Sequence, residues 1–528
     1  MGSAETEPAY RSAIFDTICV TVLIAYFLHF ALVALHGGFR GDEMMNMMIY
    51  WRAGALKSLL ANLTFWTPFY RPGGALYYLP LYYAFGLDPE PYRIVQIGIL
   101  VVSIPIVYYL SRCLASSRSV AFLAVLALCY HPRIASVVFV GAFIYDALCG
   151  FFYIAALTYY IHIRENGLLL RPGQLLGFLA LYICALNSKE MAVTLPVMVL
   201  IYEFLKAPRW GDWKAFLRWS WSFALPSLIT GLLTAAYIYG KTHGNLSLTR
   251  LDTYRPKISW HHFTTSNAKF VGELLFPHHV VTPRMLLALW AVVFIYAFMR
   301  RDRMLQLMAF WVVIVPLPIA FLTPIRGDAC LYLLLYGWAM IFGKLVSDLI
   351  MLMSKSPILI GRGAVVGGIT GAIIGGAVTD RVRGTAIGAG LGAAVGKMSP
   401  SVFVAVATVL VALALAISTQ LENQSSGYIP AVLNSGQKVA HVIKAVQSLN
   451  LRPAPRSTVL LKMKENPFPN KWHVLFIASL VWNDHTLQIW LEDVNQLPPQ
   501  QLAKVDYIIS LSEFEAHVIR SPEVSKSH

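Results

Sequence analysis

The sequence has few charged residues. Only 13% of its 528 residues are Asp, Glu, Lys or Arg, whereas a soluble domain usually has about 25%. Hydrophobic residues make up 57% of the chain, and its mean hydropathy is +0.60. This composition excludes a soluble enzyme, a disordered chain and an ordinary nucleic-acid-binding protein. It predicts a polytopic membrane protein.

Cysteine is also scarce, and the chain lacks a CxxC pair and any 34-residue helical repeat. The six cysteines lie in or beside apolar runs, which favours buried apolar residues over a disulfide framework. The first ten residues are polar and acidic, and the apolar run that follows is long enough to span a membrane. We therefore expect an uncleaved first span rather than a signal peptide.

Apolar runs predict about eleven membrane spans, separated by short basic connectors. With the N-terminus inside, all of these connectors follow even-numbered crossings, as the positive-inside rule requires. The spans are expected near residues 14–35, 94–113, 119–138, 143–163, 175–187, 191–205, 218–239, 283–299, 304–322, 329–347 and 401–418.

Acidic residues are too few to balance the basic ones, and the net charge is +15. Residues 420–528 hold 10 Lys+Arg and 9 Asp+Glu, so 14 of the 15 surplus charges lie in residues 1–419. Many of these cations fall in loops predicted to be outside, where topology statistics predict few. At least half of them are expected to be solvated loop charges, and the excess indicates an anionic lipid head group. The outer cations are Arg40, Arg52, Arg71, Arg93, Lys189, Arg250, Arg255, Lys257 and Arg326.

Glycines recur every four residues on both sides of a charged turn within residues 361–397. This period places glycines along one face of an apolar helix and permits close backbone approach. We predict a glycine-zipper hairpin over residues 358–398, between a transmembrane module at 1–350 and a last span at 399–419. Structural packing is the favoured role of the hairpin, and a pore or oligomerisation seam is the alternative.

The composition after residue 420 is that of a soluble domain. Residues 439–449 have helical spacing, whereas 458–463, 474–480, 487–491 and 505–511 resemble strands. The predicted fold is therefore an all-α polytopic membrane protein with a small C-terminal α/β domain at 420–528, outside the membrane.

Adjacent carboxylates, Asp42 and Glu43, follow the first span directly. A carboxylate held at the membrane surface could act as a general base toward a hydroxyl, and an interfacial anchor or helix cap is the alternative. The motif Tyr70-Arg71-Pro72 comes next, before four tyrosines at positions 77, 78, 82 and 83. These tyrosines indicate an interfacial belt or a platform for sugar and lipid.

A second charged motif, Ser188-Lys189-Glu190, lies between two short spans. Lys189 could hold a phosphate with Glu190 orienting it, and a loop salt bridge is the alternative. Arg326, near the start of a later span, could make a forked contact with phosphate oxygens. The histidine pairs at 261–262 and 278–279 are expected to be solvated loop residues rather than metal ligands.

Three motifs in this order resemble the C-type glycosyltransferases, polytopic enzymes that use sugars linked to lipid phosphates. They are Asp42-Glu43, Tyr70-Arg71-Pro72 with Gly86-Leu87-Asp88-Pro89, and Ser188-Lys189-Glu190 with Pro196. The chain is most similar to protein O-mannosyltransferases of the transmembrane and tetratricopeptide-repeat type and to their bacterial relatives, over residues 10–345. The repeats are replaced here by the glycine segment and the α/β domain. The stretch at 329–337 lacks the Arg and Pro of the family's late motif, and Arg326 is the expected substitute.

The resemblance implies inverting transfer of a mannose-like hexose from a polyprenyl phosphate to a protein Ser/Thr hydroxyl on the periplasmic face of the inner or plasma membrane. It implies that Asp42 and Glu43 are catalytic and that Lys189 and Glu190 lie near the lipid phosphate. We add Arg71, Tyr70, Arg326 and Arg255 as substrate-binding residues. No metal site or certain cofactor is predicted, because a lipid phosphate leaves readily, although a divalent metal remains open. Membrane lipids are expected partners and nucleic acid is not. The alternatives are a lipid or glycan acceptor, and a non-catalytic transporter or scaffold.

Overall fold

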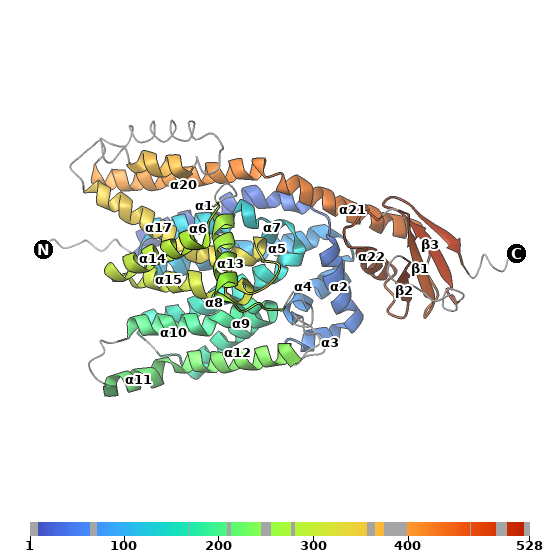
Figure 1. The fold of residues 1–528 in the computed structure, drawn as a ribbon, viewed down its shortest axis with the longest axis horizontal. Helices are drawn as coiled ribbons and strands as arrows, with labels where there is room; N and C mark the ends of the chain where they lie inside the picture. The colour runs from blue at the N-terminus through green and yellow to red at the C-terminus, as the bar shows by residue number, and fades with distance from the viewer. Residues whose placement is uncertain are drawn as a thin grey trace.

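A computed structural model describes residues 9–63, 71–167, 169–207, 213–243, 255–275, 280–355, 365–373, 399–464, 466–492 and 504–521. Most of these residues are helical (Figure 1). The α-helices are α1 (Ala9–Ala31), α2 (Gly41–Ala53), α3 (Ala55–Leu60), α4 (Ala75–Phe85), α5 (Pro89–Ala115), α6 (Arg118–Cys129), α7 (Ser136–Phe139), α8 (Ile144–Glu165), α9 (Pro172–Ser188), α10 (Leu195–Lys206), α11 (Trp213–Phe223), α12 (Leu225–His243), α13 (Trp260–Leu274), α14 (Pro283–Met299), α15 (Arg303–Ile314), α16 (Leu317–Ala320), α17 (Tyr332–Ser354), α20 (Pro400–Ser425), α21 (Tyr428–Ser448) and α22 (His473–Trp482).

Within the described part of the chain, six helical segments are long and apolar enough to cross a membrane, and a bent pair formed by α11 and α12 brings the number to as many as seven. Six of the eleven predicted spans coincide with these six segments, and the chain is an integral membrane protein. The other five predicted spans fall on helices of 12–19 residues. A 12-residue helix is only about 18 Å long, whereas the hydrocarbon core is about 30 Å thick. The long segments are Ala13–His36, Pro89–Ala115, Gly141–Glu165, Arg303–Ala320, Asp328–Ser354 and Pro400–Ser425.

The basic connectors that were predicted to share one side of the membrane contact nearby helix ends. Asp16, near the start of α1, lies 3.3 Å from Arg112 at the end of α5 and 3.3 Å from Arg118 at the start of α6. At another connector, Lys206 lies 2.6 Å from Glu165. These pairs agree with the predicted grouping, and the side of the membrane on which they lie stays a prediction.

The C-terminal domain contains a four-stranded sheet in the order β2-β1-β3-β4. β1 (Thr458–Met463) pairs in parallel with β2 (Gln488–Leu491) and with β3 (Tyr507–Leu511), and β4 (Ala516–Arg520) is antiparallel to β3. The helix predicted at 439–449 lies largely within α21, and three of the four predicted strands are present. The strand predicted at 474–480 is wrong, because these residues belong to helix α22. Its sequence is apolar on all sides, so periodicity cannot distinguish a buried helix from a buried strand.

The sheet domain packs along α2 through α22 (Figure 1). Trp51 of α2 donates a hydrogen bond from Nε1 to Oδ1 of Asn483, at 2.8 Å. The hydroxyl of Tyr82, in α4, donates to the carbonyl of Leu480 at 2.8 Å. The C-terminal domain is therefore held against the helix that carries Asp42.

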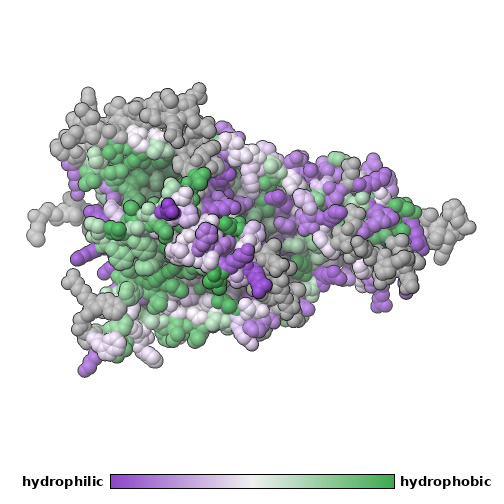
Figure 2. Space-filling view, in the orientation of Figure 1, coloured by the Kyte–Doolittle hydropathy of each residue, from purple (hydrophilic) through white to green (hydrophobic). Residues whose placement is uncertain are grey.

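The visible surface divides into two regions. Hydrophobic side chains cover much of the helical part, whereas hydrophilic side chains predominate over α21 and the sheet domain (Figure 2). This division agrees with a membrane-embedded body and a solvated C-terminal domain.

Only residues 365–373 of the predicted glycine hairpin lie within the described part of the chain, and they are helical. Val366 is buried with Phe403, Ala407 and Val411 of α20. Ser418 of α20 donates a hydrogen bond to the carbonyl of Ile373, at 2.9 Å. This part of the segment therefore packs against the last long helix, and the second arm lies outside the described residues.

Candidate functional site

The first turn of α2 separates the two adjacent carboxylates. The side chain of Asp42 is 68% exposed, and its Oδ1 lies 3.5 Å from Nε2 of His473 in α22. This side-chain interaction lowers the pKa of Asp42, burial opposes it by raising the pKa, and the charge of Arg40 lowers the pKa further. The helix N-terminus also favours a negative charge at this position. Asp42 is thus an accessible, ionised carboxylate between the membrane domain and the soluble domain.

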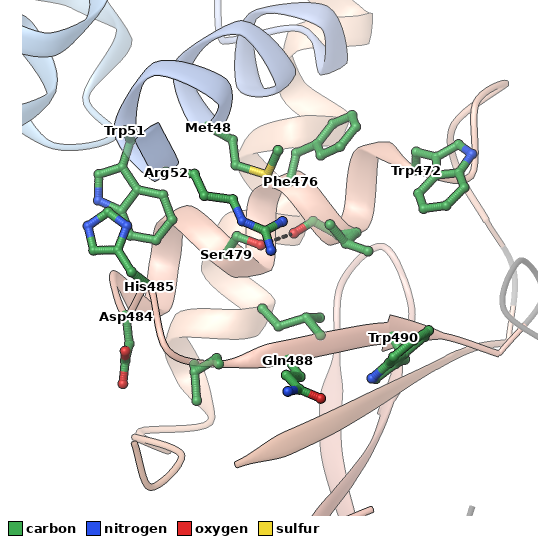
Figure 3. Close-up of a pocket in the computed structure, with 13 residues that line it drawn as sticks. Met48, Trp51, Arg52, Trp472, Phe476, Ser479, Asp484, His485, Gln488 and Trp490 are labelled. Atoms are coloured by element: carbon green, nitrogen blue, oxygen red, sulfur yellow. Dashed lines mark hydrogen bonds between the residues drawn. The ribbon is translucent and has the colours of Figure 1, made fainter. Parts of the chain in front are cut away.

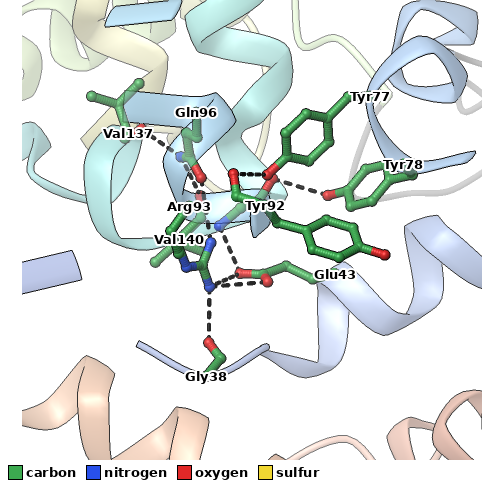
Figure 4. Close-up of polar contacts among 10 residues, drawn as sticks. Gly38, Glu43, Tyr77, Tyr78, Tyr92, Arg93, Gln96, Val137 and Val140 are labelled. Atoms are coloured by element: carbon green, nitrogen blue, oxygen red, sulfur yellow. Dashed lines mark hydrogen bonds and ion pairs between the residues drawn. The ribbon is translucent and has the colours of Figure 1, made fainter. Parts of the chain in front are cut away.

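Glu43 points in the opposite direction and is fully buried. Its carboxylate lies 3.0 Å from Nη2 of Arg93, whose side chain is also fully buried (Figure 4). The backbone amide of Gly141 donates to Oε1 of Glu43 at 2.6 Å, and Arg93 donates to the carbonyl of Gly38 at 2.8 Å. The sequence predicted a catalytic role for Glu43 and an outward role for Arg93, but here the two form an internal pair that fixes α2 on α5.

The tyrosines after Arg71 are mostly core residues rather than a belt or platform. Tyr77, Tyr78 and Tyr82 are buried, and their hydroxyls donate to backbone carbonyls at 2.8–2.9 Å. Only Tyr83 of the four is well exposed. Asp88 caps α5 by accepting a hydrogen bond from the amide of Glu90, at 3.2 Å. A buried tyrosine needs a hydrogen-bond partner, and helix ends supply free carbonyls.

Arg71 and Glu190 meet, although 119 residues separate them. Nη2 of Arg71 donates to both carboxylate oxygens of Glu190, at 2.9 and 3.0 Å, and Nε donates to Oε2 at 3.3 Å. Burial raises the pKa of Glu190, but the charges of Arg71 and Lys189 outweigh burial and lower it. The guanidinium also lies over the ring of Tyr145, 5.3 Å from its centroid. Because 20% of the Arg71 side chain remains exposed, a ligand can reach it.

Lys189 is too deeply enclosed to contact a phosphate directly. It is buried, its Nζ pairs with Asp146 of α8, and it lies 3.2 Å from Sγ of Cys330. Burial lowers the pKa of Lys189, but the charge of Asp146 outweighs burial and raises it. The cavity beside the pair has a volume of about 10 Å³, no more than a water molecule needs. Lys189 therefore acts here as part of an internal charge network.

Two of the remaining predicted residues, Arg326 and Arg255, lie in loops. Arg326 is half-buried in the loop that leads to Cys330. Arg255 is exposed, and two residues later the amide of Lys257 donates to the carbonyl of Phe321 at 2.8 Å, which joins the two loops. Tyr70 and the pair at 278–279 lie outside the described residues. His262 contacts the carbonyl of Leu322 at 3.1 Å, and no group of three potential metal ligands is present within the described ranges.

Asp42 and the charge network are connected through α2. The hydroxyl of Tyr50 donates to the carbonyl of Arg71 at 2.5 Å and lies 2.9 Å from the hydroxyl of Tyr145. Tyr50 is eight residues after Asp42, or about 12 Å along the helix axis. The structure thus brings Arg71, Lys189 and Glu190 together, and α2 links this network to Asp42 through Tyr50.

Two partners of this site were missed from the sequence. Asp146 is a lone carboxylate in an apolar span, which is a signal of function that could have been used. His473 directly precedes the run 474–480 that was assigned to a strand, whereas it is the first residue of helix α22. Nothing local in either stretch indicates that it meets Lys189 or Asp42, because those contacts join segments far apart in the chain.

Solved structures with a similar fold include two membrane enzymes. ArnT from Cupriavidus metallidurans bound to undecaprenyl phosphate matches with a TM-score of 0.51 and 14% identity, covering 97% of this chain and 94% of that one. The oligosaccharyltransferase AglB from Archaeoglobus fulgidus, in complex with an inhibitory peptide and a dolichol-phosphate, matches with a TM-score of 0.51 and 12% identity. That match covers 94% of this chain and 69% of AglB. The chain therefore shares the overall fold of these proteins.

Sequence comparison adds one segment. Residues 362–399 match a family described as glycine zipper, which agrees with the predicted glycine pattern. No curated protein matches the sequence significantly. At this level of identity, the structural likeness establishes the fold, and the activity must be argued from the site.

Proposed function

We propose that this protein is a glycosyltransferase that moves a sugar from a polyprenyl phosphate to an acceptor hydroxyl on the outer membrane face, with inversion at the anomeric carbon. The fold is shared with proteins whose structures hold undecaprenyl phosphate and dolichol-phosphate. A mannose-like hexose is the sugar that we propose, from the resemblance of the three motifs. The position of Asp42 carries this proposal.

Asp42 is the general base. It is exposed at the start of α2, and its lowered pKa keeps it ionised and able to accept a proton at neutral pH. Glu43 is assigned a positioning role, because its carboxylate is already bound to Arg93 and to the amide of Gly141. Its ion pair fixes the first turn of α2, and with it the direction of Asp42.

Arg71 is the residue that contacts the departing phosphate. Its side chain is the least buried of the charge network, at 20% exposure, and a guanidinium can bind two phosphate oxygens at once. Glu190 orients Arg71, while Lys189 and Asp146 hold the segment around Glu190 from inside. Arg326 and Arg255 are second candidates for the phosphate or the lipid head group, since their loops meet near Phe321.

The reaction follows from these positions. The acceptor oxygen attacks the anomeric carbon while Asp42 takes the hydroxyl proton. The bond from this carbon to the phosphate oxygen breaks, and its electron pair stays on the departing polyprenyl phosphate. Negative charge grows on the phosphate during this step, so a fixed cation stabilises the transition state more than the ground state. Attack opposite to the leaving group produces inversion.

Two acceptor classes remain candidates. The resemblance favours a Ser/Thr hydroxyl of a protein. A lipid-linked or free glycan is the second candidate, and a cavity with aromatic walls between α2 and the sheet domain favours it. Comparing the glycoproteins of a deletion strain with those of its parent separates the classes, because an unchanged set of glycoproteins contradicts the protein acceptor.

The enzyme assay uses the purified full-length protein, a polyprenyl-phosphate sugar and membrane extract as the acceptor source. We expect transfer by the wild type and its loss in Asp42→Asn. Full activity of Asp42→Asn would overturn the assignment of the base. No transfer from any polyprenyl-phosphate hexose would favour the non-catalytic transporter or scaffold.

A further inference from the structure

A cavity of about 570 Å³ lies between the second half of α2 and the C-terminal domain (Figure 3). Its volume is in the range of small-molecule sites in proteins, about 300–1,000 Å³. Residues from α2, α22 and β2 line it, so it exists only because the soluble domain docks on the helix that carries Asp42. None of the residues assigned to catalysis or to the phosphate lines this cavity.

Aromatic side chains form the walls of the cavity. Trp51 is buried at one side, where it stacks on His485 with ring centroids 3.9 Å apart and bonds to Asn483. Trp472, which is 42% exposed, and Phe476 lie on the α22 side, and Trp490 projects from β2. The walls thus combine one fixed ring with others that are open to a ligand.

Polar groups lie between these rings. Arg52 extends from α2 into the centre of the cavity, and Gln488 of β2 lies on the side opposite α22 (Figure 3). Both side chains are exposed. A purely lipid ligand would leave a guanidinium and an amide without partners, which is unfavourable. A sugar ring matches both features, because its C–H face packs on an aromatic ring while its hydroxyls bond at the edges.

The cavity is also separated from Asp42, the proposed general base, along the same helix. Met48 and Arg52 are six and ten residues after Asp42 on the same helix, which corresponds to about 9–15 Å along the axis. A ligand in the cavity would therefore not occupy the reaction centre. It would hold one part of an extended acceptor while another part reaches Asp42.

We infer that this cavity, named here the interdomain cleft and defined by Trp51, Arg52, Trp472, Phe476, Gln488 and Trp490, binds an oligosaccharide portion of the acceptor. The inference rests on the proposed transferase function, because only a transferase would use the bound oligosaccharide as an acceptor. Binding of the oligosaccharide does not itself require catalysis. It identifies the acceptor as saccharide-bearing, and it gives the C-terminal domain a role in acceptor selection.

The test is binding of the full-length protein, in lipid nanodiscs, to an array that carries defined oligosaccharides and Ser/Thr-containing peptides. We expect the wild type to bind one class of oligosaccharides. Trp472→Ala and Trp490→Ala should each weaken that binding about tenfold, as expected for the loss of one aromatic contact. Arg52→Gln replaces an exposed guanidinium with an amide. It changes the polar contact in the cleft and leaves the aromatic walls in place.

Trp260→Ala is the matched control, because Trp260 is 66% exposed and lies at the start of α13, outside the cleft. It should bind as the wild type does. Thermal unfolding of every variant separates loss of binding from loss of fold. If no oligosaccharide binds, or if the cleft variants and the control bind alike, the inference is wrong. Peptide binding that is lost in the cleft variants would overturn it in favour of a protein acceptor.

The two proposals fail separately. Loss of array binding in the cleft variants together with full transfer by Asp42→Asn overturns the mechanism and leaves the cleft in place. Inactive Asp42→Asn together with unchanged array binding in all cleft variants overturns the cleft and leaves the mechanism in place.

Discussion

Oδ1 of Asp42, in the first turn of α2, lies 3.5 Å from Nε2 of His473, in the first turn of α22. The two residues are 431 positions apart, and their contact joins the membrane domain to the soluble domain. Gly41 makes the approach feasible, since a Cβ atom there would lie 2.0 Å from Nδ1 of His473. The soluble domain thus contacts the residue that we assign as the base.

The first prediction concerns the base itself. Asp42→Asn should lower the rate of sugar transfer by about 10²–10⁴-fold, the usual contribution of general base catalysis. The measurement is initial rate with saturating lipid-linked sugar. Glu515→Gln is the control, because Glu515 is an exposed carboxylate in the sheet domain. Equal losses in both variants would point to a general effect on charge rather than to Asp42.

The second prediction concerns pH. The interaction with His473 lowers the pKa of Asp42, so the carboxylate stays ionised to a lower pH than an ordinary aspartate would. His473→Ala should move the acid limb of the kcat/KM profile to higher pH, because the ionised form loses its partner. The stability from this contact is present above the ordinary aspartate pKa and is lost as pH falls through the lowered value.

The groups that face Asp42 are His473 from α22 and Arg40 from its own segment. His473→Gln restores a hydrogen-bond donor and should recover part of the shift. His517→Ala changes an exposed histidine of the same domain and should leave the profile unchanged. An acid limb that is identical in His473→Ala and the wild type would show that the contact does not tune Asp42.

The third prediction concerns the buried pair of Glu43 and Arg93. Glu43→Ala leaves a buried guanidinium without its carboxylate and should destabilise the protein by about 3–5 kcal/mol. Thermal unfolding in detergent is the measurement. Glu492→Ala is the control, because its pair with Lys462 is exposed and is expected to contribute at most about 1 kcal/mol. A Glu43→Ala variant that is as stable as the wild type but inactive would favour a catalytic role for Glu43.

The fourth prediction concerns the forked contact between Arg71 and Glu190. Arg71→Lys keeps the charge but loses the geometry that binds two oxygens. We expect the KM for the lipid-linked sugar to rise about tenfold, which corresponds to about 1.4 kcal/mol of lost binding. Arg452→Lys, at an exposed position in the soluble domain, is the control. An unchanged KM in Arg71→Lys would remove Arg71 from the phosphate site.

The fifth prediction concerns the docking of the soluble domain. A Cβ atom on Gly436 of α21 would lie 2.8 Å from the backbone nitrogen of Gly38, so Gly436→Ala should separate the two segments and lower the melting temperature. Gly173→Ala, in α9, has open space around the new methyl group and should raise stability slightly. A higher melting temperature for both variants would contradict the close approach.

Several predictions from sequence were confirmed because they depend on local patterns. Long apolar runs predicted the six long segments, and the strand-like stretch at residues 458–463 predicted β1. Shorter runs were harder to interpret, since a 12-residue apolar helix and a span differ only in length and surroundings. Residues 474–480 were misassigned for a related reason, because a run that is apolar on nearly all sides in sequence has no clear period to read.

The charged residues show the same contrast between what local sequence patterns reveal and what they do not. The sequence by itself determined that this is a membrane protein, predicted a soluble C-terminal domain, and indicated where carboxylates and cations cluster. Only the tertiary structure decided which of them are accessible, because burial and pairing depend on segments far apart in the chain. Arg93 and Lys189 became internal partners of Glu43 and Asp146, whereas Asp42 stayed exposed beside His473. Because a buried charge must find a partner and an exposed one need not, residues that look alike in sequence have different roles in the fold.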